Sequence, residues 1–195
     1  MEPLALLLTA NGMENPEDRA RTVAAAQAGD RAAFERLMRQ HERMVLTTAL
    51  RLLGNREDAR DAAQEVFLRL YRNLAKVESA GNLAGWLYRV TVNVCHDQRR
   101  KQPETASVEL SALPARDASP QQEVAEAERR RALELSLRML GEKERTALVL
   151  RDLEGLSTAE VARILGSSEM TVRSQISKAR VKVKNFVEQY FRRRT

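Results

Sequence analysis

The segment STAEVARILGSSEMTVRSQISKAR, which begins at Ser157, constrains the fold of this chain more than any other stretch. Ser157 precedes an apolar run and Glu160 follows it by three residues, a capping box that predicts the start of a helix. We expect Gly166 to end that helix, because glycine adopts the left-handed C′ conformation without steric cost. Ser167 or Ser168 is placed to cap a second helix. The segment therefore predicts two helices joined by a tight turn.

The second helix of this segment has two distinct faces. Its apolar residues repeat at helical spacing and are expected to face inward: Val172, Ile176, Ala179 and Val183. Its outward face is polar and basic: Arg173, Ser174, Ser177, Lys178 and Lys182. The spacing of Ala162, Gly166 and Val172 is typical of a helix-turn-helix, whose second helix enters a DNA major groove. An ordinary helical hairpin with a solvated basic face is the alternative.

Charge is distributed unevenly along the 195 residues. Residues 129–195 carry 16 Lys and Arg against 8 Asp and Glu, whereas residues 1–128 carry 17 against 19. A basic C-terminal half indicates a polyanionic partner, and the slightly acidic remainder indicates a different role. The single cysteine, Cys95, allows no internal disulfide, which favours the cytoplasm. The apolar run at Leu4–Leu8 is too short to span a membrane and lacks the flanks of a signal peptide.

The remaining periodic segments are helical, so the sequence predicts an all-α protein. Helices are expected over about 22–54 with a break at Gly29-Asp30, and over 57–74, 83–101, 123–140 and 143–153. Three of the five prolines fall within residues 103–122, which indicates a flexible linker. The predicted organisation is a flexible lead-in (1–20), a first helical domain (21–102), the linker (103–122) and a second helical domain (123–195) with the helix-turn-helix at 157–180.

Two sequence blocks resemble one protein family. LGNREDARDAAQEVFLRLYRNL followed by GWLYRVTVNVCHDQRR is similar to region 2 of the extracytoplasmic-function (group IV) sigma factors of bacterial RNA polymerase. EKERTALVLRDLEGLS and the helix-turn-helix resemble their region 4. The resemblance implies a subunit that binds core polymerase and recognises the −35 and −10 promoter elements. Its implied partners are the clamp helices of the largest catalytic subunit, the flap, promoter DNA and an anti-sigma factor.

The resemblance and the helical faces together predict the binding residues. Residues near the start of a recognition helix reach base edges, and those further along hold phosphates. For the −35 element the predicted residues are Arg173, Ser174, Gln175, Ser177, Lys178, Arg180 and Lys182. For the −10 element they are Ser79, Asn82, Arg89, Asn93, Arg99 and Arg100. For the clamp helices they are Asp58, Asp61, Gln64, Glu65 and Leu68.

Two aromatic residues near the −10 face have other possible roles. Trp86 lies on the apolar stripe of its helix and is expected in the core, whereas the position of Tyr88 is open. Acidic residues also stabilise the first turn of their own helix, which accounts for Asp58 and Asp61 without a partner. The segment SSEMTV departs from the family pattern, where a proline and a glycine commonly precede the threonine, so the −35 sequence itself is not predicted.

No pattern in the chain predicts catalysis, a cofactor or a metal. The sequence has no HExxH, no phosphate-binding glycine loop and no G-x-S-x-G. Cys95 and His96 are neighbours on a helix and therefore point about 100° apart, which disfavours a shared metal. We therefore expect a non-enzymatic sigma factor. The alternative is a helix-turn-helix regulator with an N-terminal sensor or dimerisation domain, which would have no reason to carry the DAAQEVFLRLYR block.

Overall fold

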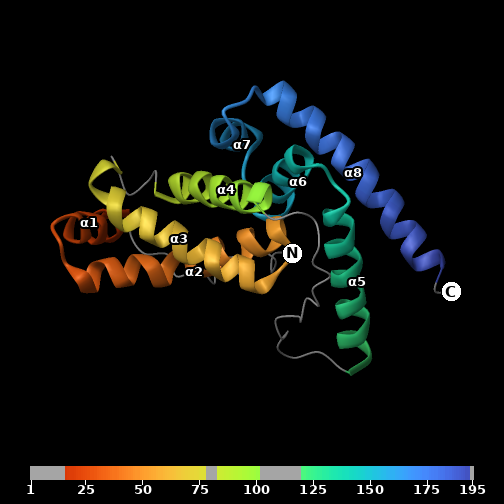
Figure 1. The fold of residues 1–195 in the computed structure, drawn as a ribbon, viewed down its shortest axis with the longest axis horizontal. Helices are drawn as coiled ribbons and strands as arrows, with labels where there is room; N and C mark the ends of the chain where they lie inside the picture. The colour runs from red at the N-terminus through yellow and green to blue at the C-terminus, as the bar shows by residue number, and fades with distance from the viewer. Residues whose placement is uncertain (1–15, 78–82, 102–119, 194–195) are drawn as a thin grey trace, which may run out of the picture.

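The fold of the chain comes from a computed structural model, which describes residues 16–77, 83–101 and 120–193. These residues are predominantly helical and contain no strand, which confirms the predicted all-α class (Figure 1). The elements are α1 (Pro16–Gln27), α2 (Arg31–Leu53), α3 (Arg56–Asn73), η1 (Leu74–Lys76), α4 (Leu83–Lys101), α5 (Pro120–Arg138), α6 (Glu142–Leu148), η3 (Val149–Leu153), α7 (Thr158–Leu165) and α8 (Glu169–Arg192). The predicted domain boundaries remain predictions.

The N-terminal half, α1 to α4, is built around the antiparallel pair α2 and α3. Asp30 caps α2 by accepting from the backbone N–H groups of Ala32 and Ala33 at 2.8 and 3.1 Å. Gly54 ends α2 at φ 76°, in the left-handed region. The apolar stripe of α3 is buried and continues into η1: Ala59, Ala62, Ala63, Val66, Phe67, Leu70 and Leu74. Helix α4 packs across α2 and α3 and closes this half of the core.

Helix α1 begins earlier than the sequence analysis predicted. The lead-in was expected to extend to residue 20, but residues 16–20 are helical. Pro16 occupies the first position of the helix, where its missing N–H costs no hydrogen bond, and Glu17 and Asp18 lie in the positive first turn. The proline therefore starts a helix here.

The C-terminal half, α5 to α8, packs the long helix α8 against α5, α6 and α7. Helix α5 begins three residues before the predicted start and ends at Arg138 rather than residue 140. The helix predicted over 143–153 is divided: α6 ends at Leu148 and continues as a π-helical turn, η3. The backbone N–H of Glu154 accordingly donates to the carbonyl of Val149, five residues back, at 2.9 Å.

The two halves are in direct contact. Helix α7 lies against α4, and both η3 and α5 lie against α2 (Figure 1). The buried apolar residues of both halves form one continuous cluster. Arg145 of α6, only 3% exposed, joins the halves because it donates to the carbonyl of Leu52 at the end of α2 as well as to carbonyls at the end of α5.

Candidate nucleic-acid and polymerase interfaces

The helix-turn-helix forms at the predicted residues. The Ser157 hydroxyl accepts from the backbone N–H of Glu160 at 3.2 Å, and the Glu160 carboxylate accepts from the backbone N–H of Ser157 at 2.8 Å. Gly166 ends α7 at φ 60°. Of the two serines predicted as the next cap, Ser168 takes the role and accepts from the backbone N–H of Thr171. The local sequence thus fixes both helix ends and the turn between them.

Helix α8 presents the predicted polar row to solvent. Val172, Ile176 and Ala179 are buried, whereas Arg173, Ser174, Ser177 and Lys178 are exposed. The Arg173 guanidinium pairs with the Glu169 carboxylate one turn earlier at 2.7 Å. This ion pair holds the arginine at the N-terminal end of α8, which is the end that reaches bases in a helix-turn-helix.

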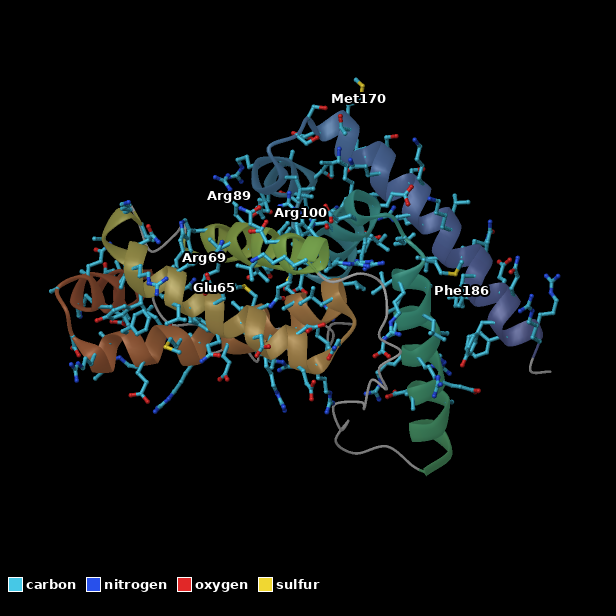
Figure 2. The ribbon with its side chains drawn as sticks, viewed as in Figure 1. Glu65, Arg69, Arg89, Arg100, Met170 and Phe186 are labelled. Atoms are coloured by element: carbon cyan, nitrogen blue, oxygen red, sulfur yellow. The ribbon has the colours of Figure 1, made fainter. Side chains whose placement is uncertain are left out.

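Met170, also at that end of α8, is a candidate contact that the sequence analysis did not select. Its side chain is 79% exposed and projects from the tip of the helix (Figure 2). A sulfur-containing apolar side chain this exposed suits contact with a thymine methyl group. The sequence did carry a signal for it: the segment SSEMTV departs from the family pattern, and its methionine stands two residues after the Ser168 cap.

Three other residues predicted to contact the −35 element are partly buried or paired with other side chains of the protein. Gln175 is half-buried, and its Oε1 is buried without a hydrogen-bond partner among the described residues. Arg180 forms two hydrogen bonds with the Asp152 carboxylate at 2.7 and 2.8 Å, and this contact raises the pKa of the guanidinium. Lys182 contacts the Glu144 carboxylate at 2.7 Å, and its hydrogen bond lowers the pKa of that carboxyl. Arg180 and Lys182 thus fasten α8 to η3 and α6.

The predicted −10 face lies on α4. Asn93 and Arg100 are exposed there, and Arg100 pairs with Asp97 on the same helix. Arg89 reaches across to α7, where its guanidinium donates to the carbonyl of Arg163 at 2.8 Å (Figure 2). Arg99 is half-buried and donates to the carbonyl of Leu52 at 3.4 Å. Ser79 and Asn82, the other predicted −10 residues, lie outside the described residues.

The two aromatic residues near this face have structural positions. Trp86 packs against the core, as expected. Tyr88 is buried, and its hydroxyl donates to the Glu154 carboxylate at 3.3 Å. Burial and the neighbouring carboxylate raise the pKa of Tyr88 above its ordinary value, so the phenol stays protonated and serves as a donor.

The predicted polymerase face runs along the outside of α3. Asp61 and Gln64 are exposed, and Leu68 is 44% exposed. Glu65 pairs with Arg69 at 2.7 Å (Figure 2). Asp58 accepts from the side chain of Asn55 at 3.0 Å, near the start of the helix.

Tyr71 extends this face and was missed by the sequence analysis. It is 68% exposed and its ring meets Phe34 edge to face at a centroid distance of 5.3 Å. Its position three residues after Leu68, on the same side of the helix, was the signal that could have identified it. Leu68 and Tyr71 together make an exposed apolar patch beside acidic residues, which fits a protein-binding surface.

The described residues offer no competing metal site. They contain no group of three or more His, Cys, Asp and Glu side chains that could hold an ion. Burial raises the pKa of the Cys95 thiol to about 12, so this cysteine is a protonated core residue. Among the described helices, none combines the length and apolar character that crossing a bilayer requires.

Comparison with protein families matches each half of the chain to a sigma-70 region. The family model for sigma-70 region 2 matches residues 37–104, and that for sigma-70 region 4 matches residues 130–183. The region 2 match covers the DAAQEVFLRLYR block, which sets aside the alternative of an N-terminal sensor domain.

Curated relatives agree with this assignment. The chain is 34% identical over 169 residues to the ECF RNA polymerase sigma factor SigE of Mycolicibacterium smegmatis, covering 83% of this chain and 65% of that protein. It is 34% identical over 174 residues to SigM of Mycobacterium tuberculosis (strain Erdman), covering 88% and 86%. It is 30% identical over 163 residues to SigW of Bacillus subtilis, covering 78% and 87%.

Solved structures share the fold. CnrH in complex with the cytosolic domain of CnrY matches with a TM-score of 0.64 at 25% identity, covering 88% of this chain and 97% of that chain. The sigma factor RpoE of Bartonella quintana, solved in complex with the anti-sigma factor NepR, matches with a TM-score of 0.65 at 21% identity, covering 80% and 96%. With both regions present in the same order and relatives matched over most of their length, the chain belongs to the extracytoplasmic-function sigma factors of the sigma-70 family.

Proposed function

We propose that the chain binds core RNA polymerase and directs it to promoters, reading the −35 element with α8 and the −10 element with the face of α4. The observation that carries this proposal is the exposed row of Arg173, Ser174, Ser177 and Lys178 on a capped recognition helix. The opposite side of that helix is buried, so this row is on the side that is available to a DNA groove.

At the −35 element, Arg173 reads a guanine through two parallel hydrogen bonds to O6 and N7. Its pairing with Glu169 at 2.7 Å supports this role, because the carboxylate restricts the guanidinium before DNA binds. Lys178 is exposed one turn further along and contacts phosphate. Arg180 and Lys182 remain about half exposed in their ion pairs, so each exchanges a carboxylate for a phosphate only by loosening α8 from its neighbours.

At the −10 element, the exposed Asn93 and Arg100 contact the DNA backbone and bases, together with Arg89 once it leaves the carbonyl of Arg163. Ser79 and Asn82 contribute to a pocket for a base that leaves the stack. Contacts between the base and such a pocket must offset the few kcal/mol that unstacking costs. The polymerase supplies the catalytic site, and this chain performs no chemistry of its own.

The α3 face binds the clamp helices of the largest polymerase subunit. One side of α3 exposes Asp61, Gln64, Leu68 and Tyr71. Glu65, which pairs with Arg69, lies beside them. An apolar patch with acidic residues beside it suits a basic helical partner. The C-terminal half engages the flap. The chain therefore acts where the polymerase is, in the cytoplasm.

An anti-sigma factor controls the free chain. The support for this is comparative: CnrH and the Bartonella sigma factor, which share the fold, were both solved with a bound partner.

The reading role is tested by substituting one base-reading and one phosphate-binding residue. The preferred −35 duplex is first selected from a random pool with the chain assembled on core polymerase. Arg173→Ala should then cost about 1–3 kcal/mol on that duplex and relax base choice at one or two positions. Lys178→Ala, the matched control, should weaken every duplex alike and lower the salt slope by about 1. An equal loss on all duplexes for Arg173→Ala would contradict base reading.

A further inference from the structure

Helix α1 ends in a turn that fixes the position of its last side chain. Ala26 is buried in the core, whereas Gln27, the last residue of α1, is exposed. Gly29 follows at φ 95°, in the left-handed region, and its N–H donates to the carbonyl of Ala26 at 3.1 Å. The N–H of Asp30 donates to the carbonyl of Ala25 at 3.0 Å, which completes a Schellman motif. The backbone at Gln27 is therefore held in one conformation.

The Gln27 side chain bridges the short turn that follows α3. Its amide nitrogen donates to the carbonyl of Leu74 at 3.0 Å and to the carbonyl of Val77 at 3.0 Å. Leu74 is the first residue of η1, and Val77 is the residue that follows η1. A primary amide has two N–H groups, so each carbonyl accepts one of them. The bridge therefore holds the two ends of η1 at a fixed separation.

Ordinary satisfaction of a helix end does not require this arrangement. The carbonyl of Leu74 already accepts from the N–H of Val77 at 3.1 Å, so only the carbonyl of Val77 would need another donor. Instead, one side chain that lies 47 residues before Leu74 in the sequence holds both carbonyls. Helix α1 lies against α2 as well as η1 (Figure 1). Through Gln27, α1 thus braces η1 against the rest of the N-terminal half.

The braced turn directly precedes residues that the proposed function assigns to the −10 element. Val77 is 4% exposed and Leu83, where α4 begins, is 2% exposed, so both are anchored in the core. In the sequence, Ser79 and Asn82 of the proposed −10 pocket stand between these two anchors. A binding site discriminates well only when supporting residues hold its frame, because a misplacement of about 1 Å already weakens the contacts. The frame here is Val77, and Gln27 is what holds its carbonyl.

We propose that Gln27 is a positioning residue for the −10 element: by fixing Val77, from which residues 78–82 continue, it sharpens base choice there. It acts through η1 and not by a contact with DNA. The effect on promoters rests on the proposed function, whereas the bridge between Gln27 and η1 does not. Because the amide is uncharged, its contribution is not screened by salt, unlike that of the phosphate-binding Lys178.

The bridge is tested on the free full-length chain by amide hydrogen exchange, measured by NMR without DNA or polymerase. Gln27→Met keeps the length of the side chain and removes both donors, so the Val77 amide should exchange about tenfold faster. Gln27→Lys keeps a donor that reaches the carbonyls and should stay within about threefold of wild type. Gln189→Met, the same change at an exposed glutamine of α8, should not alter exchange at Val77. Unchanged exchange in Gln27→Met would overturn the proposal.

The consequence for promoters is tested by transcription with each full-length variant assembled on core polymerase. One set of templates carries a fixed −35 element and every single-base change in the −10 element, and a second set reverses this arrangement. In Gln27→Met, the transcript ratio between preferred and other bases should fall several-fold at the −10 positions and stay unchanged at the −35 positions. Gln27→Lys should restore the ratio. A purely structural role would lower transcription from all templates alike and leave the ratios unchanged, which would overturn the proposal.

The two measurements separate failure of this inference from failure of the proposed function. A wild-type chain that gives no promoter-dependent transcripts would refute the proposed function, and faster Val77 exchange in Gln27→Met would still support the bridge. Base selection by the wild-type chain together with equal selection by Gln27→Met would overturn the positioning role alone. An equal loss of selection at both elements would also overturn it, because α8 belongs to the other half of the chain.

Discussion

Replacing Arg145 by methionine should destabilise the protein by about 3 kcal/mol. Arg145 is 3% exposed and donates to four backbone carbonyls, those of Leu137, Arg138, Leu140 and Leu52, at 2.6, 2.7, 3.1 and 3.1 Å. Each such bond contributes about 1 kcal/mol net, which gives about 4 kcal/mol for the set. Methionine keeps the volume and removes the desolvation cost of the guanidinium, which offsets part of this loss.

Urea unfolding followed by far-UV circular dichroism measures the effect. Arg145→Met should lower the transition midpoint with little change in its slope. Arg145→Lys should recover only part of the loss, because an ammonium group cannot reach four carbonyls that a planar guanidinium bridges. Arg39→Met, an exposed arginine with one intrahelical pair, should stay within about 0.5 kcal/mol of wild type. A loss below about 1 kcal/mol for Arg145→Met would refute the reasoning.

Two further substitutions test the polymerase face and the pH dependence. Glu65→Arg should break the pair with Arg69 and weaken co-purification with core polymerase without changing unfolding in urea; undiminished co-purification would contradict the clamp-helix assignment. His96 hydrogen-bonds Thr146 at 3.0 Å, and burial lowers the pKa of its imidazole. The charged groups that face the ring are Glu142, Asp97, Arg99 and Arg100. The unfolded state then binds more protons than the folded state, so thermal stability should fall as pH drops below about 6.5. His96→Gln should make the unfolding temperature less dependent on pH. Parallel plots of unfolding temperature against pH for the variant and the wild type would refute this.

Features that depend on neighbouring residues could be predicted from the sequence. The Ser157–Glu160 capping box, the left-handed Gly166 and the bounds of α4 follow from caps and periodicity within a few residues. The helical start at Pro16 was not predicted, because a proline breaks a helix in its interior but favours its first turn, and no neighbouring pattern in the sequence separates the two cases.

Features that depend on distant residues could not be predicted in this way. Tyr88 is fixed by Glu154, which lies 66 residues further along, and Arg145 is buried because carbonyls of α2 and α5 meet beside it. The periodic pattern of α6 gave no sign that one of its charged residues is in the core. Gln175 was predicted to contact the −35 element because it lies near the start of the recognition helix, yet packing half-buries it. The DNA and polymerase contacts themselves remain predictions from exposure and charge.

Transcription in vitro with sigma-free core polymerase tests the central claim most directly. The purified chain is mixed with core enzyme and genomic DNA fragments, and the 5′ ends of the transcripts are mapped. The account predicts a defined set of start sites that share one motif near −10 and one near −35, with the latter altered in transcripts made with Arg173→Ala. Start sites no different from those of core polymerase alone would contradict it.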